Sequence, residues 1–294
     1  MSTADAAGTW KLGDVTVNRM GFGAMRITPN PDRHVAIRVL RRAVELGVNH
    51  IDTAAFYRSP GGTLRVGDGE VRYANERIRE ALAPYPDELV ITTKVGPGED
   101  PERGFYHATT AAELRTQVET NLRQLGLDHL DVVNLRIMKK PGADSIAERF
   151  GALADLRDAG LIRQLGISNV RADHLDEALA IAPVVCVQNS YAVDLRREED
   201  ALIRLCAERD IAYVPFFAIA GPKRESDATP EDSSAVEAIA AQHGVSPQQI
   251  RLAWTLHQGA NVLAIPGTGN PAQLEENVAA GAIRLSPAEL ATLG

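Results

Sequence analysis

Three residues with complementary chemistry, Asp52, Tyr57 and Lys94, follow apolar runs in the first third of the chain. A buried lysine needs a carboxylate partner, and Asp52 can supply one. An ammonium group beside a tyrosine favours the phenolate form, which lowers the phenol pKa from about 10 and makes Tyr57 a usable proton donor near neutral pH. The same residues would also suit a structural Asp–Lys pair beside a core tyrosine, so spacing alone leaves both interpretations open.

These residues belong to a regular alternation of short β-rich runs with amphipathic stretches of helical length. Gly47, Gly126 and Gly160 each follow a helical period, as expected at helix ends. Eight strands alternating with helices favour a parallel sheet closed as a (β/α)8 barrel, also called a TIM barrel. The expected strands are residues 20–24, 49–53, 88–94, 130–136, 162–167, 184–188, 212–217 and 261–265.

The length of 294 residues would fit two average domains, but a single barrel of this kind needs roughly 250 residues. No linker rich in proline or serine divides the alternation, so we expect one barrel domain over residues 1–294. Residues 10–18 are typical of a short hairpin that plugs the bottom of the barrel. Residues 221–234 are polar and indicate a long loop after the seventh strand.

Polar residues end several of the expected strands, where (β/α)8 barrels carry their chemistry. Ser168, Asn169 and Gln188 place hydroxyl and amide groups there, and a side-chain amide can hydrogen-bond a carboxamide in both directions. Phe216 could stack on an aromatic ring. Taken singly, the polar residues could equally be turn or cap residues, and Phe216 could be a core residue.

The run GTGNPA at residues 267–272 matches a dinucleotide fingerprint, GxGxxA. A Rossmann fold would need a further strand and an acidic residue about 20 positions on, and no strand follows before Gly294. We therefore expect a phosphate site at a helix start in the last barrel loop, with Asn270 as N-cap and Pro271 as the first helical residue. A plain helix-start loop is the alternative.

Composition removes several classes of function. The formal net charge of −8 argues against a nucleic-acid binder. Two cysteines cannot form a disulfide framework, which fits a reducing, cytoplasmic location. We expect no signal peptide and no membrane span. The scattered histidines give no metal-ligand spacing, and no GxSxG elbow of a hydrolase occurs.

Eight motifs spread along the chain suggest a family. They are GFGAM (21–25), IDTAAFY (51–57), NERIREAL (75–82), ITTKVG (91–96), NLRQLGLDHLDVV (121–133), GLIRQLGISN (160–169), VQNSY (187–191) and IPGTGNPAQLEEN (265–277). In this order and on the expected barrel, they make the chain similar to the aldo-keto reductase family over essentially its whole length. The resemblance implies a barrel oxidoreductase that uses NADPH or NADH to reduce a small-molecule aldehyde or ketone.

The resemblance also implies roles for individual residues. Tyr57 corresponds to the general acid, and Lys94 and Asp52 to the residues that tune it. Phe216 corresponds to the aromatic platform under the nicotinamide. The other cofactor contacts that it implies are Gly23, Ala24 and Met25 on the first-strand wall, Ser168, Asn169 and Gln188 on the carboxamide, Gly267, Thr268 and Gln273 near the phosphate, and Glu276 and Asn277 on the adenosine.

Arg136 departs from the family pattern, which usually has histidine at the end of the fourth strand. Arginine can donate hydrogen bonds but does not titrate. We expect Arg136 to polarise the substrate carbonyl or to hold an anionic substrate group; pairing with a loop carboxylate is the alternative. The run VVNLR at residues 132–136 resembles a bacterial branch in which some members reduce pyridoxal, so a pyridoxal-like substrate is a lead.

Two further departures concern loops. Residues 58–69 lengthen the segment between Tyr57 and Lys94, and they could form a lid, with positive charge from Arg58 and Arg65, or a solvated loop. Gly267 and Gln273 stand where members specific for NADPH often carry Lys and Arg, which weakens the preference for NADPH over NADH. Residues 58–69, 139–144 and 221–234 are expected to shape the substrate pocket.

Two rival functions remain. Lys94 at a strand end could form a Schiff base in a class I aldolase. With arginine in place of the usual histidine, the chain could also be a regulatory subunit that senses a nucleotide without turnover.

Overall fold

The computed structural model describes residues 3–62, 66–100, 104–137, 144–195, 199–219 and 234–294. Seven parallel strands form one sheet in the order β13-β12-β11-β10-β7-β4-β3. In chain order these strands are β3 (Phe22–Gly23), β4 (His50–Asp52), β7 (Val90–Val95), β10 (Leu130–Arg136), β11 (Ile162–Ser168), β12 (Cys186–Gln188) and β13 (Ala212–Tyr213).

Two isolated bridges close this sheet into a barrel. Met20 pairs in parallel with Ala264, and Tyr213 pairs in parallel with Val262. The segment 262–264 therefore occupies the eighth position, between the first and last strands of the sheet. This arrangement confirms the (β/α)8 barrel that the alternation predicts.

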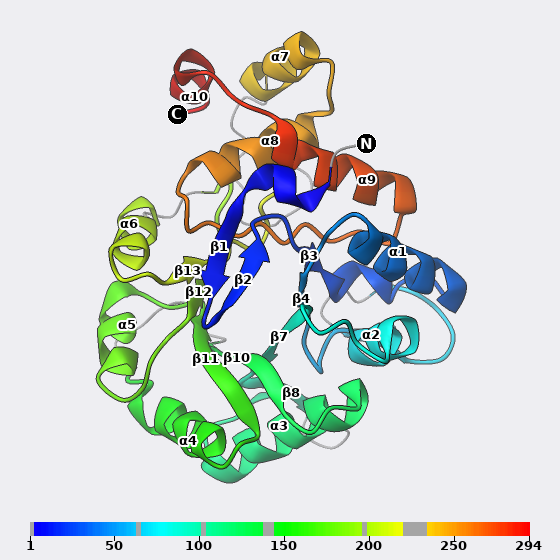
Figure 1. Cartoon of the computed structure of the whole chain (residues 1–294). Helices are drawn as coiled ribbons and strands as arrows, with labels where there is room; N and C mark the ends of the chain where they lie inside the picture. The colour runs from blue at the N-terminus through cyan, green and yellow to red at the C-terminus, as the bar shows by residue number, and fades with distance from the viewer. Residues whose placement is uncertain (1–2, 63–65, 101–103, 138–143, 196–198, 220–233) are drawn as a thin grey trace.

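Helices surround the barrel as an outer ring (Figure 1). They are α1 (Arg33–Glu45), α2 (Ala74–Leu82), α3 (Ala111–Leu125), α4 (Ala147–Asp158), α5 (Ala172–Leu179), α6 (Asp200–Glu208), α7 (Ser234–His243), α8 (Pro247–His257), α9 (Pro271–Ala279) and α10 (Pro287–Leu293), with short 3-10 turns η1 (Ala4–Ala7), η2 (Ala24–Ile27) and η3 (Ala280–Ala282). Among the described residues, none of these helices combines the length and apolar character that a membrane crossing requires.

Local sequence signals explain where the helices begin and end. Thr110 and Glu113 form a reciprocal capping box that starts α3, and Gly126 ends it with a positive φ of 69°. Asn270 accepts hydrogen bonds from the backbone N–H groups of Ala272 and Gln273, and Pro271 is the first residue of α9. The predicted helix start in the last barrel loop is therefore confirmed.

A hairpin of β1 (Thr9–Leu12) and β2 (Val15–Asn18) lies across one end of the barrel (Figure 1). Its inward-facing Leu12 and Val17 are buried in one cluster with Val90, Val132 and Leu263, which lie near the amino ends of their strands. The hairpin thus closes the bottom of the barrel, as the sequence predicts, and leaves the opposite mouth open.

The seventh strand is shorter than its expected range of 212–217. The regular strand ends at Tyr213, although the N–H groups of Val214 and Phe216 still donate to the carbonyl oxygens of Val187 and Asn189. Pro215 has no N–H to donate toward the eighth segment, and Phe217 adopts a positive φ of 66°. Phe216 keeps one isolated bridge to Ser190. The chain therefore turns at Phe216 and Phe217, above the barrel mouth.

Two short antiparallel pairs flank the mouth: β5 (Arg58–Ser59) with β6 (Arg72–Tyr73), and β8 (Pro97–Asp100) with β9 (Gly104–His107). The first pair encloses the extra loop after Tyr57. The buried guanidinium of Arg72 anchors the base of that loop by donating to the carbonyl oxygens of Thr28, Pro29, Asp68 and Glu70. Arg65 and most of the loops 139–144 and 221–234 lie outside the described residues.

Glycines let the first strand and the last barrel loop approach each other closely. A Cβ atom at Gly267 would lie 2.4 Å from the carbonyl oxygen of Gly23, and one at Gly23 would lie 2.6 Å from the carbonyl oxygen of Ile265. Both contacts involve backbone, which cannot move aside as a flexible side chain can. Any side chain at these two positions would push open the seam where the barrel closes.

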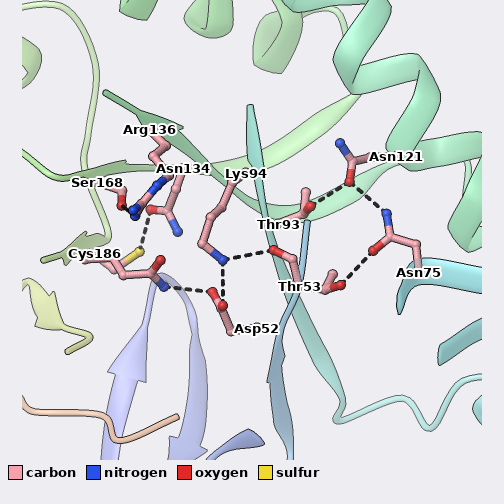
Figure 2. Close-up of polar contacts among 11 residues, drawn as sticks. Asp52, Thr53, Asn75, Thr93, Lys94, Asn121, Asn134, Arg136, Ser168 and Cys186 are labelled. Carbon is pink, nitrogen blue, oxygen red and sulfur yellow. Dashed lines mark hydrogen bonds and ion pairs between the residues drawn. The ribbon is translucent and has the colours of Figure 1, made fainter. Parts of the chain in front are cut away.

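A network of buried amides and hydroxyls joins two strands to the helices outside them (Figure 2). The Thr53 hydroxyl donates to Asn75 Oδ1 (2.7 Å), and Asn75 Nδ2 donates to Asn121 Oδ1 (2.9 Å). The Thr93 hydroxyl donates to the same Asn121 oxygen (2.6 Å). Because Thr53 follows Asp52 and Thr93 precedes Lys94, α2 and α3 fix the ends of β4 and β7 from outside the barrel.

Replacing Gly267 with alanine should destabilise the protein, because the new methyl group meets the Gly23 backbone. We expect a loss of about 1–3 kcal/mol of unfolding free energy in urea denaturation. Gly151→Ala is the matched control: its Cβ would meet nothing within 4 Å inside α4, and it should stabilise by about 0.5–1 kcal/mol. Equal stability of the Gly267 variant and the parent would contradict the close contact.

Replacing Thr53 with valine keeps the shape of the side chain but leaves the buried Asn75 Oδ1 without its donor. An unsatisfied buried acceptor costs about 1–3 kcal/mol, so the urea midpoint should fall accordingly. In the control Thr116→Val, an exposed hydroxyl that donates to Ala112 O is removed, and the change should stay within about 0.5 kcal/mol. Similar small effects in both variants would mean that the network contributes little.

Candidate active site

The barrel mouth holds a buried ion pair between Asp52 at the end of β4 and Lys94 in β7. Lys94 Nζ lies 2.5 Å from Asp52 Oδ1, and the two side chains are 1% and 5% exposed. Lys94 Nζ also donates to the carbonyl oxygen of Thr53 (3.0 Å), and Gln188 Nε2 donates to Asp52 Oδ2 (2.7 Å). Both carboxylate oxygens of Asp52 are thus engaged, as a buried charge requires.

Tyr57 completes this group. Lys94 Nζ lies 4.8 Å from the centre of the Tyr57 ring. The backbone of Tyr57 is fixed on both sides, because its N–H donates to Ala54 O (3.0 Å) and its carbonyl accepts from the Ala74 N–H (2.9 Å) at the start of α2. The sequence-predicted trio of Asp52, Tyr57 and Lys94 is therefore assembled in one place.

Charge and burial act in opposite directions on Lys94. Burial alone would lower the pKa of its ammonium group, but the negative charge of Asp52 and the contact with Tyr57 outweigh burial and raise the pKa above its ordinary value. Lys94 is therefore protonated across the physiological range. A permanent ammonium group beside a phenol stabilises negative charge on the phenol oxygen.

An open cavity with about 840 Å³ of empty space faces this group. Eight of the predicted site residues line it: Gly23, Met25, Asp52, Tyr57, Arg136, Gln188, Phe216 and Gly267. Lys94 lines a neighbouring cavity together with Phe56, Tyr73 and Gln117. The residues come from strand ends all around the barrel, so only the closed sheet brings them together.

Arg136 forms one wall of the cavity, at the end of β10. Its Nη1 donates to the Ser168 hydroxyl (3.0 Å), and its guanidinium carbon lies 4.6 Å from the centre of the Phe216 ring. Burial lowers the pKa of its guanidinium, with partial opposition from Tyr57 and Asp52. The expected alternative, pairing with a loop carboxylate, is not found among the described residues.

Gln188 carries an unsatisfied group into the site. Its Nε2 is engaged with Asp52, but its Oε1 is buried and has no hydrogen-bond partner among the residues that the structure describes. A buried carbonyl oxygen without a donor is costly and marks a place where a bound ligand can donate.

The other predicted cofactor residues lie outside the cavity wall. Ala24 is buried at the start of η2. Ser168 is bonded to Arg136, and Asn169, at a positive φ of 61°, donates to Ile137 O (2.8 Å). The Thr268 hydroxyl donates to Gln273 Oε1 (2.7 Å) beside the N-terminus of α9.

Further along α9, Asn277 is buried and the carbonyl of Glu276 accepts from Gln249 (3.0 Å).

The structure adds residues that sequence reasoning missed. Phe56, Phe217, Arg26 and Pro266 also line the cavity. Phe56 packs edge-on against Tyr57, with ring centres 5.2 Å apart, and Phe217 packs edge-on against Phe216 at 4.9 Å. Their adjacency to predicted site residues was the available signal, but adjacency in sequence does not say which of two neighbours faces the cavity.

Known proteins resemble this chain over nearly its whole length. The model of the aldo/keto reductase family matches residues 19–294. A pyridoxine 4-dehydrogenase from Escherichia coli is 44% identical over 298 residues, with 98% of each chain covered. An NADH-specific methylglyoxal reductase from Escherichia coli is 28% identical and covers 94% of this chain and 93% of its own.

Among solved structures, an aldo-keto reductase from Klebsiella pneumoniae in complex with NADPH has a TM-score of 0.79 and 26% identity, covering 97% of this chain and 93% of its own. Family match, extensive identity and shared architecture agree along the barrel. The chain belongs to the aldo/keto reductase family and is an oxidoreductase.

Proposed function

We propose that the protein reduces an aldehyde or ketone to an alcohol with NADPH, or alternatively NADH, and that Tyr57 donates the proton. The main support for this proposal is that Asp52 contacts Lys94, and Lys94 contacts Tyr57, at the wall of an open cavity. Bound reduced nicotinamide would supply the hydride to the carbonyl carbon. Tyr57 gives its phenolic proton to the carbonyl oxygen and recovers a proton from solvent afterwards.

Lys94 and Asp52 act through Tyr57 in this proposal. The Lys94 ammonium stabilises the tyrosinate left after proton transfer, which lowers the barrier to that transfer. Asp52 keeps Lys94 charged and, with Thr53 O, fixes the direction of its N–H groups. Arg136 adds a second positive charge at the cavity, where negative charge develops on the carbonyl oxygen.

Several residues fit a nicotinamide dinucleotide. The unpaired Oε1 of Gln188 can accept from a carboxamide N–H, and Phe216 offers an aromatic face beside it. The capped N-terminus of α9 suits a phosphate group. The NADPH complex of the Klebsiella relative supports NADPH, and the NADH-specific relative keeps NADH as the second candidate.

A pyridoxal-like carbonyl compound is the substrate we favour. The relative with 44% identity is a pyridoxine 4-dehydrogenase, and the cavity is lined by aromatic rings that suit a flat heteroaromatic ring. We place the reaction in the cytoplasm, where the two buried free thiols would remain reduced.

A class I aldolase is disfavoured by the state of Lys94. Schiff-base formation needs a neutral, accessible amine. Lys94 is 1% exposed, paired with Asp52 and has a raised pKa, so it is held as an ammonium ion.

Tyr57→Phe should lower kcat by at least about a hundredfold, because the general acid is lost, while NADPH still binds. Fluorescence titration with NADPH and NADH measures cofactor binding, and assays on an aldehyde panel that includes pyridoxal measure kcat. Tyr85→Phe is the control, since the Tyr85 hydroxyl donates to Leu125 O, and Tyr85 does not line the cavity. Parental kcat in Tyr57→Phe would refute the role of Tyr57.

Tight NADPH binding without turnover in the parent would favour a nucleotide-sensing subunit.

A further inference from the structure

Within the part of the chain that the structure describes, Arg136 at the barrel mouth has no carboxylate counter-ion. Asp52 is the acidic residue whose charge acts on Arg136, but both of its oxygens are already bonded, one to Lys94 and the other to Gln188. Among the described residues no carboxylate forms an ion pair with Arg136. Asp52, Lys94 and Arg136 together carry one net positive charge, and because Arg136 is half-buried at the cavity wall, an anionic ligand can neutralise that charge.

The orientation of Arg136 is fixed before any ligand binds. Ser168 holds Nη1 from one side, because β10 and β11 pair Arg136 directly with Ser168, and the guanidinium carbon lies over the Phe216 ring. Arginine carries five N–H donors in one plane, and a single bond to Ser168 leaves most of them for the cavity. Such a planar fork matches two coplanar oxygen atoms better than one.

The Tyr57 side chain and the Arg136 guanidinium face the same cavity. Tyr57 and Arg136 both line it, together with the aromatic rings of Phe56, Phe216 and Phe217. A substrate whose carbonyl oxygen is reached by the Tyr57 hydroxyl can therefore place a neighbouring oxygen against Arg136. An ionised neighbouring oxygen would supply the missing counter-charge.

We propose that Arg136 makes the protein selective for carbonyl compounds that carry an ionised oxygen coplanar with, and adjacent to, the reacting carbonyl. This inference rests on the proposed reduction at Tyr57 and names its substrate class. Two sources share the chemistry: the phenolate of an ortho-hydroxy aromatic aldehyde and the carboxylate of a 2-oxo acid. Arg136 is then a specificity-determining residue as well as a source of positive charge at the carbonyl.

The test compares kcat/KM for matched substrates at alkaline pH, where the phenol is ionised. The pairs are 2-hydroxybenzaldehyde against 2-methoxybenzaldehyde, and phenylglyoxylate against its methyl ester. A hydrogen bond to a charged group predicts a preference of about ten- to a hundredfold for the anionic member of at least one pair. That pair identifies whether phenolate or carboxylate is the source of the anion.

In Arg136→Met the preference should fall to near unity, whereas Arg136→Lys should keep only part of it, because lysine retains the charge but lacks the fork. Arg209→Met is the matched control: it removes an arginine that pairs with Asp176 outside the cavity and should leave the ratio unchanged. Circular dichroism confirms that each variant is folded. A parental ratio near unity for both pairs, or a ratio that survives Arg136→Met, would overturn the proposal.

A binding measurement separates this inference from the proposed reaction. Salicylate presents coplanar anionic oxygens but cannot be reduced, so calorimetry reports recognition alone. We expect its Kd to rise at least about tenfold in Arg136→Met. If the parent reduces no aldehyde yet salicylate binding still depends on Arg136, the proposed reaction fails and the recognition stands. Salicylate binding that is insensitive to Arg136 would overturn the recognition.

Discussion

The buried ion pair between Asp52 and Lys94 is the constraint on which the rest of the mouth depends. Two charges that are 5% and 1% exposed are costly to remove from water, and they are tolerated only with close contact and full hydrogen bonding. The 2.5 Å contact, the Thr53 carbonyl and the Gln188 amide meet that requirement. Three strands, β4, β7 and β12, must therefore keep their relative positions for the pair to persist.

Hydrogen bonds on the outer side of β4 and β7 hold the strand positions next to this ion pair. Successive residues point to opposite faces, so Asp52 and Lys94 face the barrel interior while their neighbours Thr53 and Thr93 face the helices. Asn75 and Asn121 receive both hydroxyls outside the barrel, and Asn75 adjoins Ala74, which holds the backbone of Tyr57. The polar network on the outer face thus supports the strand ends that carry Asp52 and Lys94 (Figure 2), and it adjoins the residue that holds the backbone of Tyr57.

Among the described residues that surround the cavity, positive charge exceeds negative charge, and the proposed chemistry uses the excess. Lys94 is neutralised by Asp52, and in the proposed reaction it stabilises negative charge on Tyr57, whereas Arg136 contacts a neutral hydroxyl and an aromatic ring. A neutral partner fixes the direction of the guanidinium without cancelling its charge. The site is therefore electrostatically complementary to a substrate that arrives with an anionic oxygen and develops further negative charge as it is reduced.

The sequence by itself determined the barrel and the family, and it singled out Asp52, Tyr57 and Lys94, which the structure brings together, because strand–helix alternation, helix caps and local motifs lie in short stretches of chain. It did not reveal that Arg136 bonds to Ser168, since that contact depends on the register between β10 and β11, 32 residues apart. Nor did it reveal the early end of β13 at Tyr213 or the left-handed backbone of Phe217. Charge balance, orphaned donors and acceptors, and the Thr53–Asn75–Asn121 network exist only between elements, so only the tertiary structure decided them.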